Sequence, residues 1–335
     1  MHNTLRTTFG RVLSRSLLLL AFISGAPCFA QTVAVAQISG FVKDPSGGAI
    51  ANAEVRATQT ATRLVRVTVT DTAGGYVLPA LPIGPYQLEV TASGFKKYIH
   101  SGIVLEVGNN VQINAGMQLG TVSESVAVSA QADMVQTSDT TISQVIDQRR
   151  IVDLPLNGRQ PTQLILLAGA ALNAPSGDTV SSKNFFSSTS ISVAGGQANT
   201  LNYMLDGADN NDSFSNVNLP IPFPDALQEF SVDTGTLPGQ YGLHPGGTVN
   251  AVTKSGTNAL HGDLFEFLRN GDVNARNFFG TTHDSLKRNQ FGGTVGGPIV
   301  KDKIFFFGGF QGMFNRQEPP QTISYVPTAA VTSGD

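Results

Sequence analysis

Short β-favouring stretches, separated by turns rich in glycine, proline, asparagine and aspartate, recur along most of this 335-residue chain. One such turn is Asp44-Pro-Ser-Gly-Gly48, and the stretch that follows Pro85 places Tyr86, Leu88 and Val90 on one face. About seven strands at a spacing of about 8–12 residues are typical of a β-sandwich. Charged residues make up only 13% of the chain, and it holds 36 glycines, which favours sheets and turns over long surface helices. We therefore predict a mainly β fold that begins with a β-sandwich over residues 37–119.

Residues 1–30 have the layout of a secretory signal peptide. A basic stretch without acidic residues precedes an apolar run at residues 16–23, and small residues stand at Cys28 and Ala30, the two positions that a signal peptidase reads. The apolar run is too short to anchor a protein in a bilayer. Cleavage between Ala30 and Gln31 would remove Cys28, the only cysteine, and with it any disulfide, thiolate metal site or cysteine nucleophile. The alternatives are a buried N-terminal helix and a lipoprotein anchored at Cys28.

Charge and histidine spacing argue against two function classes. After cleavage the chain keeps no basic run, which argues against a nucleic-acid partner. The remaining histidines show no zinc-peptidase spacing, and no G-x-S-x-G motif is present. We therefore predict no enzyme activity, no catalytic residues, no cofactor and no metal, with a dispersed serine triad as the alternative.

Residues 121–255 combine helix-like and strand-like patterns. Ile142 to Ile151 carries apolar residues at helical offsets, and Pro161 to Ala168 begins with a proline that suits a first helical turn. Four short strand patterns follow, at residues 190–194, 201–205, 229–233 and 248–253. We expect a small α+β domain.

The motifs of the first domain carry a family resemblance. They are Ile38-Ser-Gly-Phe-Val-Lys-Asp44, Asp71-Thr-Ala-Gly-Gly-Tyr76, Leu81-Pro-Ile-Gly-Pro-Tyr86 and Ala92-Ser-Gly-Phe95. In this order they resemble the carboxypeptidase regulatory-like domain, a transthyretin-like sandwich. The resemblance implies a non-catalytic domain, either a carbohydrate-binding module or a spacer.

The second domain resembles the plug of TonB-dependent outer-membrane receptors. The motifs are Asp153-Leu-Pro-Leu-Asn-Gly-Arg159, Ile191-Ser-Val-Ala-Gly-Gly196, Tyr203-Met-Leu-Asp-Gly207 and the stretch from Gly246 to Gly256. A sandwich in front of a plug is similar to the Oar-like receptors. The resemblance implies a plug at residues 121–255, a periplasmic N-terminal domain, and TonB as the partner that supplies energy.

In that family a short box before the plug pairs with TonB as a β-strand. By position the matching segment consists of Glu124, Ser125, Val126, Ala127, Val128, Ser129 and Ala130. Such pairing uses main-chain hydrogen bonds, so side-chain identity can vary. The alternative is that this segment is the first strand of the plug.

An acidic cluster lies in the predicted plug, and its residues are Asp206, Asp209, Asn210, Asn211 and Asp212. The spacing of the acids does not fit an EF-hand calcium loop. An Asp/Asn/Gly turn is the simpler interpretation. The hypothesis that remains for function is a loop that contacts substrate.

Residues 261–335 alternate glycine with aromatic residues, which is typical of curved membrane strands with aromatic girdles. They resemble the first barrel hairpins of Oar-like receptors, and an ordinary soluble sheet is the alternative. A plugged transporter barrel needs about 22 strands, whereas these residues hold about five at most. We therefore expect an incomplete barrel, from a fragment or a truncated gene product, because lipid does not tolerate an open sheet.

The combined expectation is the front of a TonB-dependent receptor in the outer membrane, in contact with its lipid. Its substrate would be too large for a porin, such as a siderophore, glycan or peptide. The alternative is a carbohydrate-binding or adhesion module at the cell surface.

Overall fold

The computed structural model describes residues 35–121, 125–129, 141–169, 171–173, 190–198, 200–214, 216–235, 246–276, 278, 283–318, 327 and 329–334. The predicted cleavage position at Ala30 and Gln31 lies outside these residues. Glu124 and Ala130, the two ends of the predicted TonB box, also lie outside them.

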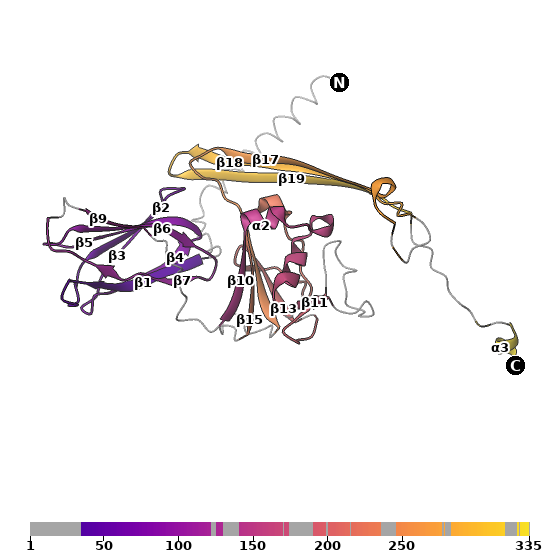
Figure 1. Cartoon of the computed structure of the whole chain (residues 1–335), viewed down its shortest axis with the longest axis horizontal. Coiled ribbons are helices and arrows are strands. Elements are labelled where there is room, and N and C mark those ends of the chain that lie inside the picture. The colour runs from indigo at the N-terminus through magenta and orange to yellow at the C-terminus, as the bar shows by residue number, and fades with distance from the viewer. Residues whose placement is uncertain are drawn as a thin grey trace, which may run out of the picture. The chain divides into compact units, whose positions relative to one another are not determined.

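The first domain is a β-sandwich, as the sequence predicts. One sheet has the order β4-β1-β7, with β8 also paired to β1, and the other has the order β3-β2-β5-β6-β9. In Figure 1 these strands run from indigo to purple. Their bounds are β1 Val35–Lys43, β2 Glu54–Gln59, β3 Val65–Val69, β4 Gly75–Pro82, β5 Gly84–Thr91, β6 Lys97–Leu105, β7 Asn110–Gln112, β8 Ala115–Gly116 and β9 Ser125–Ser129.

Aspartate turns and alternating apolar residues build this sandwich. The carboxylate of Asp44 accepts hydrogen bonds from the backbone N–H groups two and four residues further on, both at 2.8 Å. Asp71 makes the same two bonds, also at 2.8 Å, so each turn is fixed by its own aspartate. Tyr86, Leu88 and Val90 are all buried in the core between the sheets, which confirms their shared face.

The middle domain, residues 141–253, is an α+β unit. Its sheet has the order β10-β15-β16-β13-β14, and β11 pairs with β12 in a separate hairpin. Its core contains Ile151 of α2 and Leu164 of η2 together with Tyr203 and Phe230 of the sheet. The segments α2 and η2 therefore pack on the same apolar cluster as the sheet. The bounds are β10 Thr141–Asp147, α2 Gln148–Asp153, η1 Asn157–Arg159, η2 Pro161–Leu167, β11 Ala171–Asn173, β12 Ile191–Val193, β13 Leu201–Leu205, β14 Ala208–Asp209, η3 Pro224–Ala226, β15 Leu227–Gly235 and β16 Gly247–Thr253.

The expectation of a helix over Ile142 to Ile151 is wrong for its first half. Residues 141–147 form β10, which pairs antiparallel with β15 along its whole length. The stretch is rich in β-branched residues, which fit a pleated surface, and pairing with β15 outweighs the helical spacing. The helix α2 begins only at Gln148, where Asp147 caps it by accepting a 3.0 Å bond from the N–H of Arg150.

The last part of the described chain is a three-stranded antiparallel sheet of long strands in the order β17-β18-β19, drawn in orange and yellow in Figure 1. The strands span His261–Asn270, Lys287–Val300 and Ile304–Arg316, with η5 at Gly271–Val273 and the short helix α3 at Ala329–Ser333. All three reach the length of about 9–11 residues that a membrane strand needs. No helix in the described part of the chain is long and apolar enough to cross a membrane.

Glycine and aromatic residues fit together across this sheet. A Cβ atom built on Gly292 would lie 2.7 Å from the ring of Phe265, and one on Gly312 would lie 2.7 Å from the ring of Phe291. The glycines therefore leave the space that the aromatic rings fill. This confirms the strand assignment that the glycine–aromatic alternation predicts.

Candidate functional site

The turn after α2 sets the position of Arg159. Helix α2 ends at Asp153, and η1 follows within the predicted Asp153 to Arg159 motif. Gly158 has a φ of 69° and Arg159 a φ of 57°, both in the left-handed region. An arginine rarely adopts this backbone conformation, and such strain persists where surrounding contacts hold the residue.

Those contacts surround the guanidinium of Arg159. Its Nη2 donates to Oδ2 of Asp225, and the two residues are only 8% and 5% exposed. Its Cζ atom lies 4.2 Å from the ring centroid of Phe265 and 4.1 Å from that of Phe267, both on β17. A guanidinium placed over aromatic faces gains cation–π attraction, and arginine suits this role better than lysine.

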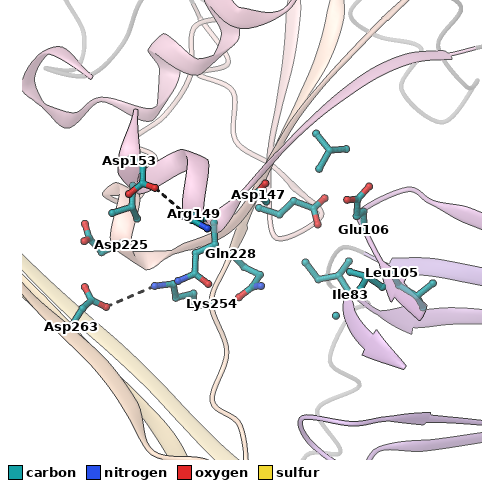
Figure 2. A pocket seen from close by; sticks show the side chains of 16 residues that line it. Ile83, Leu105, Glu106, Asp147, Arg149, Asp153, Asp225, Gln228, Lys254 and Asp263 are labelled. Atoms are coloured by element: carbon teal, nitrogen blue, oxygen red, sulfur yellow. Dashed lines mark ion pairs between the residues drawn. The ribbon is translucent and has the colours of Figure 1, made fainter. Parts of the chain in front are cut away.

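A second ion pair lies beside the first. Lys254 follows β16 and forms an ion pair with Asp263 on β17 (Figure 2), in which Nζ lies 3.8 Å from Oδ1. Asp263 also interacts with both partners of the first pair, repelling Asp225 and attracting Arg159. Two cations and two anions therefore form one charge-balanced group: Arg159 and Asp225 come from the middle domain, Lys254 directly follows its last strand β16, and Asp263 lies on β17.

The backbone of η1 is also bonded to the long strands. Gln290 on β18 donates from Nε2 to the carbonyl of Gly158 at 3.0 Å. Arg269 and Arg288 donate from Nη1 to Oδ1 of Asn157, at 3.2 and 3.5 Å. A Cβ on Gly158 would lie 2.9 Å from the Nη1 atom of Arg288, a flexible side-chain end that can move, so the left-handed turn is what favours glycine here.

We call this set of contacts the Arg159 clasp, formed by Asn157, Gly158, Arg159, Asp225, Lys254, Asp263, Phe265, Phe267 and Gln290. Burial lowers the pKa of Arg159, which the carboxylate of Asp225 opposes, and an arginine remains protonated after such a shift. Burial raises the pKa of Asp225, and the neighbouring guanidinium counteracts that rise. The clasp thus joins the middle domain to β17 and β18 through ion pairs, hydrogen bonds and cation–π contacts.

The predicted TonB box forms a strand in its central part. Ser125–Ser129 are β9, which pairs in parallel with β6 from Lys97↔Ser125 to Ser101↔Ser129. The structure therefore adds this segment to the edge of the sandwich sheet, and within the described residues β9 has no place in the sheet of the middle domain.

The predicted substrate loop is held together by its own polar side chains. Asp206 accepts two 2.8 Å bonds from Thr253, one from its N–H and one from its hydroxyl. Asn211 donates to the carbonyl of Leu201 at 2.9 Å and accepts from the N–H of Tyr203 at 2.6 Å. These atoms serve the scaffold, so a role in substrate contact stays a prediction that centres on the exposed Asp209.

The remaining members of that loop make similar local contacts. Asn210 donates from Nδ2 to the carbonyl of Leu219 at 3.2 Å, and the N–H of Asp212 donates to the carbonyl of Val217 at 2.8 Å. Across the part of the chain that the structure describes, no group of three histidine, cysteine, aspartate or glutamate side chains could hold a metal ion.

Sequence reasoning named the turn that carries Arg159 but missed the clasp. Asp225 lies 66 residues further along the chain, and no local pattern marks it as the partner of Arg159. The available signal was weak. It consisted of an arginine directly after an Asn-Gly turn, in a chain with few charges.

Two family models match the chain. Residues 37–118 match the carboxypeptidase regulatory-like domain, and residues 252–335 match an outer membrane beta barrel domain. The "TonB-dependent transporter Oar" of Myxococcus xanthus is 28% identical over 316 residues, which cover 90% of this chain. The chain spans only 28% of the length of that relative.

Solved structures give more distant likenesses. The siderophore receptor PirA from Acinetobacter baumannii is 20% identical, with a TM-score of 0.37, over 52% of this chain and 24% of the receptor. A putative carbohydrate-binding protein from Bacteroides uniformis is 11% identical, with a TM-score of 0.22, over 24% of this chain and 40% of its own.

The two matched domains and the matched relative agree with the order of folds along the chain. The first matched stretch coincides with the sandwich, and the second contains β17, β18 and β19. The chain is therefore an outer-membrane protein, homologous to a TonB-dependent transporter, that joins a carboxypeptidase regulatory-like domain to the strands of an outer-membrane β-barrel domain.

Proposed function

We propose that this chain forms the gating and energy-coupling part of a TonB-dependent receptor. In this proposal the middle domain is the plug, the sandwich lies in the periplasm, and TonB pulls on the segment around β9. The substrate is too large for a porin, and a siderophore, a glycan and a peptide all fit that description.

The Arg159 clasp is the observation that supports a gating role. A plug has to hold its barrel firmly at rest and yet leave it without unfolding. The clasp concentrates buried charge at the junction between the middle domain and β17, so the junction is specific in its geometry. Water can also solvate these charges once the contact opens. Exposing an apolar junction of the same size to water would cost more free energy.

The place of β9 along the chain supports the coupling role. It follows the sandwich and precedes β10, the first strand of the middle domain. A force applied to β9 would therefore reach the middle domain through the chain itself. TonB would bind β9 by adding a strand to it, because main-chain hydrogen bonds along a strand give affinity with little demand on sequence.

Site-directed crosslinking tests the coupling role. A single cysteine in place of Val126 on β9 should form a disulfide with a cysteine placed in the pairing strand of TonB. The control is Val69→Cys on β3, at the opposite edge of the same sheet, where the side chain is 60% exposed. Crosslinking at Val126 alone supports the proposal, and equal crosslinking at both positions, or none at Val126, contradicts it.

A carbohydrate-binding role for the sandwich is the second candidate. A groove on its surface is lined by Phe41, Tyr76 and Val77 together with the polar residues Asp71 and Gln112. Phe41 is 42% exposed there, and an exposed aromatic ring beside hydrogen-bonding groups suits a sugar. Glycan-array binding that is lost in Phe41→Ala would support this role, and a blank array would remove it.

A further inference from the structure

The strand β9 is an edge strand with one side occupied. It is the last strand in the order β3-β2-β5-β6-β9, and its five residues pair in unbroken register with β6. In a parallel ladder, successive residues turn their N–H and C=O groups alternately to the two sides. Alternate residues of β9 therefore direct these groups away from β6, toward an edge that has no partner strand among the described residues.

That outer edge lacks the features that usually block strand addition. Edge strands are protected by charged side chains, prolines or bulges. The residues of β9 are Ser-Val-Ala-Val-Ser, and the pairing with β6 contains no register shift. At the opposite end of the sheet, β3 carries Arg66 as its second residue. The two edges therefore differ in sequence, because β3 carries a charged residue and β9 carries neither a charged residue nor a proline.

We propose that β9 accepts its partner strand through this outer edge while it remains paired with β6. The occupant is the edge strand of the periplasmic domain of TonB, so this inference rests on the proposed function and adds the mode of binding. The sandwich then acts as a holder for the coupling segment. The sandwich sheet then continues through β9 into the partner strand, and β9 does not separate from β6 during binding.

The physical advantage of this arrangement is preorganisation. A free five-residue segment loses backbone entropy when a partner orders it as a strand. Pairing with β6 has already fixed β9 in the extended conformation, so the partner meets a formed strand. The sandwich then raises affinity without touching the partner.

A disulfide between β6 and β9 tests the inference directly. Ile99 and Ala127 are register partners, and Ala127 is exposed, so the pair lies on the side of the sheet away from the core residue Tyr98. Adjacent strands are about 4.7–4.9 Å apart, within the Cα spacing of about 4.4–6.8 Å that disulfides adopt. The Ile99→Cys/Ala127→Cys double variant of the full chain, purified in detergent, can be compared in its oxidised and reduced forms.

The measured quantity is the Kd for the purified periplasmic domain of TonB. The inference expects the oxidised form to bind within about threefold of the reduced form, or more tightly. A loss of tenfold or more that reduction restores would overturn it, since β9 would then have to leave β6 to bind. If the wild type binds TonB and only the oxidised variant loses binding, the inference fails but the proposed function stands. If the wild type does not bind TonB, both the inference and the proposed function fail.

Hydrogen exchange gives a second readout that does not depend on the disulfide. Binding should add protection at β9 amides and leave the protection of β6 amides unchanged. Faster exchange along Lys97 to Ser101 on binding would show that the partner displaces β9 from β6, which contradicts the inference.

Discussion

Arg159 and Asp225 form a hydrogen-bonded ion pair across 66 residues of sequence, and both side chains are almost fully removed from solvent. One comes from the turn after α2 and the other from η3 before β15. The pair lies against two phenylalanine rings of β17, so it joins two parts of the middle domain to the first long strand.

Removal of one partner from this pair should be strongly destabilising. Asp225→Ala leaves the Arg159 guanidinium buried without its counter-ion, which costs about 3–5 kcal/mol. Thermal and denaturant unfolding of the purified protein would measure the loss. A matched control is Arg149→Ala, because the Arg149–Asp153 pair shown in Figure 2 has side chains that are 90% and 67% exposed. Removing that surface pair should cost about 1 kcal/mol or less. Similar losses in both variants would contradict the assignment.

The aromatic part of the clasp should couple energetically to Arg159. Phe267→Leu keeps apolar volume but removes the ring, so about 0.5–2 kcal/mol of cation–π attraction should disappear. A double-mutant cycle of Phe267→Leu with Arg159→Met would isolate the coupling energy. Phe314→Leu on β19 serves as the control, since Phe314 is exposed and contacts the ring of Phe291. A coupling near zero would mean that the ring acts only as apolar filling.

Removal of the Arg159 side chain allows a test of gating. If the clasp holds the plug, Arg159→Ala should increase ion conductance through the receptor in planar bilayers, while the exposed-pair variant Arg149→Ala should leave it unchanged. Equal conductance in the two variants would count against a gating role for the clasp.

Within the predicted substrate loop, two aspartates should separate a structural role from a functional one. Asp206→Ala removes both acceptors for Thr253 and should cost about 1–3 kcal/mol of stability. Asp206→Asn keeps an acceptor and tolerates the left-handed backbone at φ 52°, so it should retain most of the stability. Asp209→Ala should change stability little, because the Asp209 side chain is exposed and its one hydrogen bond among the described residues is accepted from the N–H of Asn211. A fall in substrate uptake with Asp209→Ala at unchanged stability would support the loop as a substrate contact, and normal uptake would remove that hypothesis.

A glycine in the first strand should not tolerate a side chain. A Cβ on Gly40 of β1 would lie 1.9 Å from the carbonyl oxygen of Ile113, which also accepts a 2.7 Å bond from the Tyr76 hydroxyl. Gly40→Ala should therefore destabilise the sandwich by about 1–3 kcal/mol or more. Gly116→Ala on β8 is the control, because nothing lies within 4 Å of the added Cβ. In differential scanning calorimetry, Gly40→Ala should melt at a lower temperature than Gly116→Ala. Equal melting temperatures for the two variants would contradict the close approach.

Local pattern predicted most strands because turn chemistry and alternation act over a few residues. Asp44 and Asp71 fix their turns within four residues, and the alternation of β5 is visible in the sequence alone. The strand β6 lacks a clear pattern over residues 97–103, where charged and polar residues interrupt the alternation. Its place depends on pairing with β5 and β9, and no local rule records that pairing.

The β-rich fold, the sandwich and the kinship with an outer-membrane transporter could be predicted from the sequence alone. These conclusions rest on short-range periodicity, on turns and on motifs that persist along the chain. Three further features required the folded chain: residues 141–147 form a strand, β9 pairs with the sandwich, and Arg159 contacts Asp225 and the rings of β17. Each of these depends on partners far away in sequence, because backbone pairing and buried charge are satisfied only when the folded chain brings those partners together.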